Sequence, residues 1–336
     1  MLKTLARCLL FSLALLPAAA SATEPVRLKL SFFSSDSAML YGGGVKPFVD
    51  AVNSEAKGLL EIEVFFSGAL GKAPAQQPQL VRDGVADIAF IVPGYTAAQF
   101  PDNAVIELPG LFRDQQEASL AYTRMIAANA LRGYEDFIVI TAFTVEPHSI
   151  HTRRPIASLD DLKGLKIRVN NPTEAATFEK LGMRAIVMPV NQIADAIGSG
   201  EIDGAALPPA MLAEFGLGRL ATYHYMIRAD TPSLALVMSR SKFASLSPRA
   251  QDIIQKHSGE WSVAKSNAFF EEINAKSMQH LLSEPKRHVI FPSQADRIRI
   301  DVAFGEVIDE WVAKQPHNRS LLNMVRSEIG KMQSRH

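Results

Sequence analysis

Cysteine is almost absent from this sequence, which has a single cysteine, Cys8, among its 336 residues. Cys8 lies in an N-terminal segment that starts with Lys3 and Arg7, continues through an apolar stretch and reaches the small residues Ala20-Ser21-Ala22. This order is typical of a cleavable secretory signal, so we expect residues 1–22 to be removed and the mature protein to reach the periplasm. A mature chain without cysteine has no disulfides, and its stability must come from a packed core.

Long hydrophobic runs and an excess of one charge are also missing. The apolar stretch at residues 8–16 is too short to cross a bilayer, and no later segment supplies the roughly 20 apolar residues that a transmembrane helix needs. Basic and acidic residues are balanced at 35 each, and no basic stripe is interleaved with aromatic residues. We therefore expect a soluble mature protein that has no nucleic-acid partner.

Motifs for catalysis and cofactor binding are absent as well. The sequence has no nucleophile elbow, no zinc-protease motif, no phosphate-binding loop followed by Lys-Ser/Thr and no dinucleotide fingerprint. His148 and His151 have helical spacing, but Pro147 and Pro155 enclose them, which makes a helix and a shared metal site improbable. We expect no catalytic residue, no cofactor and no metal. A single histidine in a polar cleft and an ordinary structural histidine both stay open.

Strand-like and helix-like segments alternate in two successive units, which predicts an α/β fold with mainly parallel sheets covered by helices. The segment from Ser247 to about Leu282 is almost wholly helical, with Pro248 suited to a first turn, and this long helical stretch could bridge two lobes. The predicted strands are residues 26–33, 60–66, 87–92, 137–143, 165–169, 184–189 and 202–206.

Residues 155–183 carry the strongest functional signal. A short helix from Ser158 and a turn at Gly164 lead into a strand that contains Arg168, and a loop then leads into a helix that we expect Thr173 to cap. A guanidinium on a buried strand is costly without an anion, and its planar donors match a carboxylate two bonds at a time. From the residues alone, a bound carboxylate and an internal salt bridge to Asp or Glu are both open.

At this segment the chain resembles the DctP-type solute receptors of tripartite ATP-independent periplasmic (TRAP) transporters. The resemblance is carried, in family order, by FFSGALGKAPAQQPQLVRDGVADIAF at 65–90, ELPGLFRD at 107–114, LKGLKIR ending at Arg168, and MPVNQIADAIGSGEIDGAALP at 188–208. It covers essentially the whole mature chain. It implies two α/β lobes around a central cleft, joined by crossover strands and a long bridging helix. We expect lobe I to comprise residues 26–145 with 234–274, and lobe II residues 146–233 with 275–336.

The resemblance also implies ligand-binding residues. In the family, the arginine at the position of Arg168 clamps the substrate carboxylate, and His148 stands where many members carry a second polar or cationic group. Leu207 occupies the place of an asparagine found in sialic-acid-binding relatives, which argues against that substrate. Phe33, Ser34 and Tyr95 lie where such receptors line the cleft from the other lobe, although either aromatic side chain could equally belong to the core. Asn170, in the loop after Arg168, completes the predicted ligand-binding residues.

The resemblance therefore predicts a monomeric periplasmic receptor that captures a small organic carboxylate and delivers it to the TRAP membrane permease subunits. A sugar acid, an aromatic acid and a keto or hydroxy acid all fit, with a slight preference for a monocarboxylate that contains a ring. Two alternatives are a periplasmic enzyme acting on an organic acid and a receptor that reports ligand to a sensor kinase.

Overall fold

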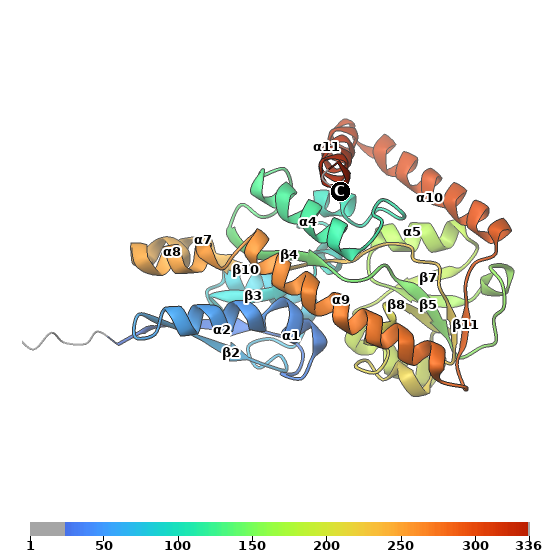
Figure 1. Ribbon diagram of the computed structural model, residues 1–336, viewed down its shortest axis with the longest axis horizontal. Coiled ribbons are helices and arrows are strands. Elements are labelled where there is room, and N and C mark those ends of the chain that lie inside the picture. Colours follow the sequence, from blue (N-terminus) through green and yellow to red (C-terminus); the bar gives the residue numbers. More distant parts are fainter. Residues whose placement is uncertain (1–23, 335–336) are drawn as a thin grey trace, which may run out of the picture.

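Two β-sheets organise the protein, whose computed structural model describes residues 24–334 (Figure 1). The expected signal segment, residues 1–22, lies outside the described residues. The first sheet has the order β2-β1-β3-β10-β4, and only β10 runs antiparallel to its neighbours. Its strands are β1 (Val26–Ser31), β2 (Leu60–Phe65), β3 (Ile88–Ile91), β4 (Phe137–Thr144) and β10 (Ser233–Ser239).

The second sheet has the order β11-β9-β5-β8-β6-β7, with β5 antiparallel to β8 and β9. Its strands are β5 (Ser149–Thr152), β6 (Lys166–Val169), β7 (Arg184–Val187), β8 (Gly204–Leu207), β9 (Tyr223–Tyr225) and β11 (His288–Ile290). β5 and β8 are buried along their whole length, as is expected for central strands covered on both faces. The α/β class predicted from the alternation is confirmed.

Helices flank the sheets, and several of them, including α5 and α8, begin at a residue whose side chain caps the helix. Ser247 caps α8, with Pro248 in the first turn, and Asn171 caps α5 by accepting a hydrogen bond from the Glu174 amide. The expectation that Thr173 caps α5 was wrong, because Pro172 already occupies the first helical position. The helices are α1 (Met39–Gly44), α2 (Lys46–Glu55), α3 (Gln77–Arg82), α4 (Gln115–Ala127), α5 (Pro172–Lys180), α6 (Ile193–Ser199), α7 (Arg240–Ser245), α8 (Pro248–Lys256), α9 (Glu260–Ser283), α10 (Gln294–Lys314) and α11 (Pro316–Gln333).

The predicted helical stretch after Ser247 is divided in two. Gly259 separates α8 from α9 with a φ of 62°, a left-handed conformation that glycine adopts without steric cost. Its amide donates to the Ile140 carbonyl of β4 at 2.8 Å, which fixes the break against the sheet. The predicted short helix at Ser158 is a single 3-10 turn, Asp160–Leu162.

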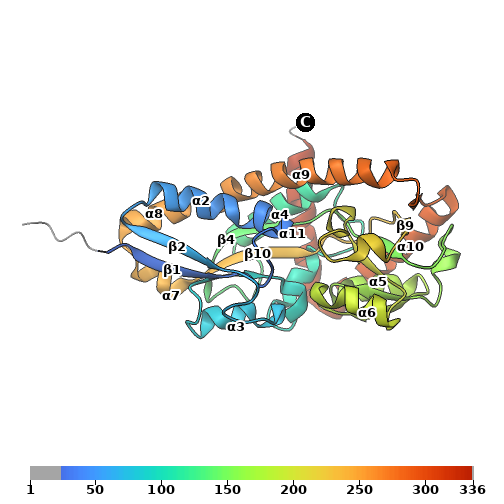
Figure 2. The same cartoon turned by 90° about the horizontal axis from the view of Figure 1, so that it is seen from below.

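Three connections join the two sheets. Residues 145–148 lead from β4 to β5, and residues 226–232 lead from β9 to β10. These crossover segments lie side by side, because the His148 amide donates to the Asp230 carbonyl and the Ala229 amide donates to the His148 carbonyl, both at 2.9 Å. The third connection is α9, which contacts α1, α4 and the 3-10 turn Pro209–Met211 and runs along both halves of the molecule (Figure 2). The predicted two-lobed architecture with a bridging helix is confirmed.

The C-terminal helices divide between the two halves. α10 packs against α5, beside the second sheet, whereas α11 packs against α4 and the 3-10 turn Pro101–Val105, beside the first sheet. Leu321, Leu322 and Val325 of α11 belong to the same buried cluster as Tyr122 of α4. This packing differs from the expectation that all of residues 275–336 belong with the second sheet. No helix among residues 24–334 is long and apolar enough to cross a membrane.

Candidate functional site

Arg168 lies on β6 with only 1% of its surface exposed. Its Nε donates to the Met188 carbonyl at 2.7 Å, and its Nη1 donates to the Ala206 carbonyl at 3.2 Å. Its Nη2 donates to the Tyr95 hydroxyl at 3.2 Å and to Asn170 Oδ1 at 3.3 Å. All four acceptors are neutral, and no carboxylate within residues 24–334 forms an ion pair with the guanidinium. The internal salt bridge that the sequence left open is therefore not formed, and the buried cation lacks a directly paired anion.

A small cavity of about 30 Å³ opens beside this guanidinium. Of the predicted ligand-binding residues, Phe33, Tyr95, His148, Asn170 and Leu207 line it together with Arg168, whereas Ser34 is not part of the lining. The rest of the lining is apolar, and sequence reasoning did not single it out: Leu40, Val92, Val145, Val190, Met211, Phe215, Pro232 and Leu234. These residues come from both halves of the chain, so the cavity lies between the two lobes.

Tyr95 connects the two sides of this cavity. It belongs to the 3-10 turn Pro93–Thr96 that follows β3, and its hydroxyl accepts hydrogen bonds from Arg168 Nη2 and from the Val190 amide at 3.0 Å. Gly94, beside it, lies so close to the opposite half that a Cβ atom there would be 2.8 Å from Asn171 Cβ. The two halves therefore touch each other around Arg168.

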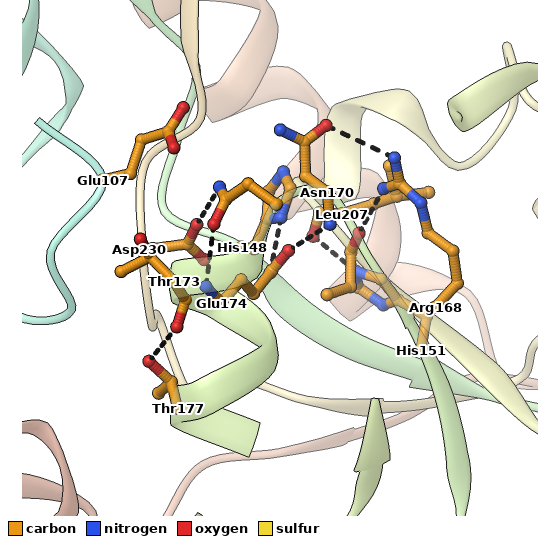
Figure 3. Close-up of polar contacts among 12 residues, drawn as sticks. Glu107, His148, His151, Arg168, Asn170, Thr173, Glu174, Thr177, Leu207 and Asp230 are labelled. Atoms are coloured by element: carbon orange, nitrogen blue, oxygen red, sulfur yellow. Dashed lines mark hydrogen bonds and ion pairs between the residues drawn. The ribbon is translucent and has the colours of Figure 1, made fainter. Parts of the chain in front are cut away.

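His148 enters the cavity from the first crossover segment and is 2% exposed. Its Nδ1 lies 2.8 Å from Glu174 Oε1, and Glu174 Oε2 accepts from the Asn170 amide at 2.6 Å (Figure 3). Asn171 links Glu174 to the second crossover segment, since its Nδ2 donates to Asp230 Oδ2 at 3.2 Å. No motif in the sequence points to Asp230, which lies in an irregular segment, and Glu174 is recognisable there only as an acidic residue near the start of the expected helix.

Burial sets the protonation of this network. It lowers the pKa of His148 to about 4, and the Arg168 charge acts in the same direction. Burial raises the pKa of Glu174 to about 7. Burial also raises the pKa of Asp230 well above its usual range, and the negative charge of the neighbouring Glu174 carboxylate adds to that increase. A neutral imidazole beside an acid pair that holds one proton is the expected state near neutral pH.

The same three side chains offer one possible metal-ligand atom each, within 4.8 Å of one another. His148 Nδ1 and Glu174 Oε1 are already engaged with each other, and the cationic Arg168 lines the same cavity. A hydrogen-bonded network accounts for this cluster without a cation.

His151, three residues after His148 in the sequence, lies in a different network, which agrees with the expectation that the two histidines do not share a site. It lies on β5, and its Nδ1 is 2.8 Å from Nδ1 of His224 on β9, while its Nε2 is 3.0 Å from the Leu207 carbonyl. His148 and His151 therefore serve different networks.

Comparison with known proteins agrees with a two-lobed receptor for a small anion. The family model for bacterial extracellular solute-binding protein, family 7 (DctP) matches residues 33–315. A TRAP solute-binding protein from Rhodoferax ferrireducens, in complex with copurified benzoate, is 27% identical with a TM-score of 0.85, and the match covers 92% of this chain and 99% of that one. A marine metagenome TRAP solute-binding protein specific for aromatic acid ligands, in complex with 3-hydroxybenzoate, is 26% identical with a TM-score of 0.83 and the same coverage.

Among curated proteins, the 2,3-diketo-L-gulonate-binding periplasmic protein YiaO of Escherichia coli is 25% identical over 286 residues, 83% of this chain and 85% of its own length. The architecture and the buried arginine thus define a solute receptor with a cleft between lobes. The chain belongs to family 7 of the bacterial extracellular solute-binding proteins.

Proposed function

We propose that the cavity beside Arg168 binds an aromatic monocarboxylate, with the carboxylate on the Arg168 guanidinium and the ring among the apolar side chains. The observation that carries this proposal is a buried guanidinium whose contacts are all neutral. An anion that pairs with it recovers much of the cost of burial. Apart from His148, Asn170 and the tyrosine hydroxyl, the lining offers little for the many hydroxyls of a sugar acid.

The two structures with bound benzoate and 3-hydroxybenzoate support the same ligand class, since both are more than 25% identical to this chain over nearly its whole length. A larger cavity of about 210 Å³, lined by Gly94, Glu107, Thr173 and Trp311, is a weaker candidate. Its one cationic side chain, Lys314, is exposed, so water hydrates its charge and no ligand anion is needed beside it.

The ligand enters while the lobes are apart. A volume of about 30 Å³ accommodates little more than a water molecule, so the lobes separate or lining side chains move before an aromatic acid fits. The carboxylate then binds Arg168 on the second sheet, and Phe33 and Tyr95 close over the ring from the first. Contacts that exist only in the closed form stabilise closure.

We also propose the remaining assignments, which membership of this family supports. The protein acts as a monomer in the periplasm after loss of residues 1–22, and it delivers its ligand to the TRAP membrane subunits without chemical change. Membership of a solute-binding family supports a binding protein rather than an enzyme. We place residues 316–333 with lobe I because α11 packs there, and keep the expected boundaries elsewhere.

Calorimetric titration with benzoate, 3-hydroxybenzoate and a hexuronate tests the proposal. We expect the aromatic acids to bind more tightly, and Arg168→Ala to weaken them more than about tenfold, since removing one member of a buried charge pair typically costs about 2–5 kcal/mol. Arg184→Ala, on the adjacent strand β7 and exposed, is the matched control. Unchanged affinity in a folded Arg168→Ala protein contradicts the assignment.

A further inference from the structure

We infer that His148 presents a hydrogen-bond acceptor to the ligand, so that the preferred ligand is a monocarboxylate that also carries a hydroxyl group. This inference rests on the proposed function, because it concerns a second contact in the same cavity. Its basis is the set of bonds that fixes which ring nitrogen of His148 carries the proton.

Glu174 is the group that decides the tautomer. Its Oε2 accepts from the Asn170 backbone amide at 2.6 Å, and an amide N–H can only donate. Glu174 also lies in the first turn of α5, where the helix dipole favours a negative charge. Its other oxygen, Oε1, faces His148 Nδ1 at 2.8 Å. A carboxylate with both oxygens accepting requires the imidazole proton to lie on Nδ1.

Asp230 is the neighbouring acid that shares a proton with Glu174. Of the two neighbouring acids it is the one whose pKa rises further, owing to burial and the Glu174 carboxylate, so the proton that the pair holds resides on Asp230. Its Oδ2 accepts from Asn171 Nδ2, while its Oδ1 is buried and has no hydrogen-bond partner among residues 24–334. Above the Glu174 pKa of about 7, the Glu174 carboxylate is therefore ionised and accepts from His148, so the measurements below are made at pH 8.

The opposite edge of the imidazole faces the cavity. His148 lines the cavity, and its Nε2 has no hydrogen-bond partner within the described chain, yet it is not among the fully enclosed polar atoms. Burial and the nearby Arg168 charge keep the ring neutral. A neutral imidazole with its proton on Nδ1 carries a lone pair on Nε2, and a lone pair accepts hydrogen bonds but cannot donate one.

The ligand group that meets this nitrogen must be a donor. A phenolic or alcoholic hydroxyl fits, whereas a methoxy group or a second carboxylate would place one acceptor against another. Sites built to bond a ligand hydroxyl reject analogues that lack it far more strongly than apolar pockets reject a missing methylene. We therefore expect a hydroxybenzoate isomer to bind at least about tenfold more tightly than its methoxy counterpart, and the corresponding dicarboxylate to bind more weakly still.

Titration of the wild-type protein with benzoate and with the 2-, 3- and 4-hydroxy, methoxy and carboxy derivatives is the first measurement. The second is the Glu174→Gln variant. A glutamine can keep its carbonyl on the Asn170 amide and turn its NH2 group towards His148 Nδ1, which moves the imidazole proton to Nε2. A hydroxyl can also accept, so its affinity persists, and the ratio of hydroxy to methoxy affinity should fall towards one. Glu179→Gln, exposed on the same helix, should leave the ratio unchanged.

Nitrogen-15 NMR of the histidines in the wild-type protein reads the tautomer directly and does not depend on the variant folding. A proton on His148 Nε2, or a methoxy acid that binds as well as its hydroxy counterpart, overturns the inference while leaving carboxylate binding intact. Failure of every acid in the panel to bind contradicts the proposed function instead.

Discussion

His151 and His224 meet edge to edge in the second sheet, with 2.8 Å between their Nδ1 atoms. The Leu207 carbonyl fixes the direction of this bond, because it can only accept and so places a proton on His151 Nε2. His151 Nδ1 then accepts from His224 Nδ1, and His224 Nε2 can accept from Arg287, which lies 3.5 Å away. The chain of bonds links a residue of the cavity lining to the segment that follows the bridging helix.

The buried histidine pair leads to a prediction that replacing His224 lowers the free energy of unfolding by an amount that depends on pH. Burial lowers the pKa of His224 to about 2 and that of His151 to about 4, both below the unfolded value of about 6.5. A depressed histidine pKa gives stability that is present above pH 6.5 and is lost as the pH falls towards the folded pKa. His224→Asn keeps a donor towards His151 but removes this titration. Its destabilisation should be largest near pH 7 and shrink by about 1.4 kcal/mol per pH unit between about pH 6.5 and 4.

Urea unfolding of wild type and variant at several pH values measures this difference, with the exposed His280→Asn as the control. Because both proteins carry the same buried acids, the acids cancel in the comparison. A destabilisation that is constant from pH 7 to pH 4 would show that His224 is not held neutral by the fold.

The close contact of Gly94 with the opposite lobe leads to a prediction about closure of the lobes. The Gly94 backbone needs no positive φ, so alanine is acceptable there in the open protein. In the closed arrangement, a Cβ at this position would lie 2.8 Å from Asn171 Cβ and 3.1 Å from Asn170 Nδ2, which is too close for carbon. Gly94→Ala should lower ligand affinity by about tenfold or more with little change in the thermal midpoint.

Small-angle scattering measures whether the loss of affinity comes from incomplete closure of the lobes. Wild type should contract when ligand is added, and Gly94→Ala should contract less at the same occupancy. Gly198→Ala provides a matched substitution, since no atom lies within 4 Å of a Cβ placed there. Equal affinity and equal contraction in Gly94→Ala and wild type would mean that closure does not bring these residues together.

Removing the Tyr95 hydroxyl should cause a smaller loss of ligand affinity. Tyr95→Phe removes the acceptor for Arg168 Nη2 and for the Val190 amide, which leaves a backbone donor unpaired in the closed cavity. An unpaired buried donor costs about 1–3 kcal/mol, so affinity should fall at least about fivefold in titration calorimetry. An affinity equal to that of wild type would mean that these two bonds are replaced in the ligand complex.

The sequence predicted Arg168 and the two-lobed fold because both depend on patterns that are local or follow the order of motifs. Hydrophobic periodicity and the order of motifs indicate strands, helices and a buried arginine, even when the residues that contact them are not known. Asn171 was missed as the helix cap because Thr173 is an equally good capping residue in sequence, and only the position of Pro172 decides between them.

The partners of His148 could not be predicted for a different reason. Glu174 follows it by 26 positions and Asp230 comes from the second crossover segment, so their meeting depends on how two lobes and two crossovers pack. Placement of α11 beside α4 is likewise a tertiary result, since the apolar residues of α11 pack against residues about 200 positions earlier in the chain, such as Tyr122. Local periodicity carries no record of such contacts.

The buried Glu107 carboxyl leads to a prediction about stability at higher pH. The Glu107 side chain is 3% exposed, and Oε1 accepts from the Ser233 hydroxyl at 2.5 Å and the Ser233 amide at 3.2 Å. Burial raises the pKa of Glu107 to about 8. A raised carboxyl pKa gives stability that is present below the unfolded value of about 4.3 and is lost as the pH rises to about 8.

Glu107→Gln mimics the protonated acid and does not titrate. It should match wild type in free energy of unfolding near pH 4.5 and become the more stable protein by about 1.4 kcal/mol per pH unit up to about pH 8. Urea midpoints at pH 4.5, 6 and 8 measure the gap, with the exposed Glu179→Gln as the control. A gap that does not widen with pH would show that Glu107 is ionised in the fold, and that a cation or solvent reaches it from the 210 Å³ cavity that it lines.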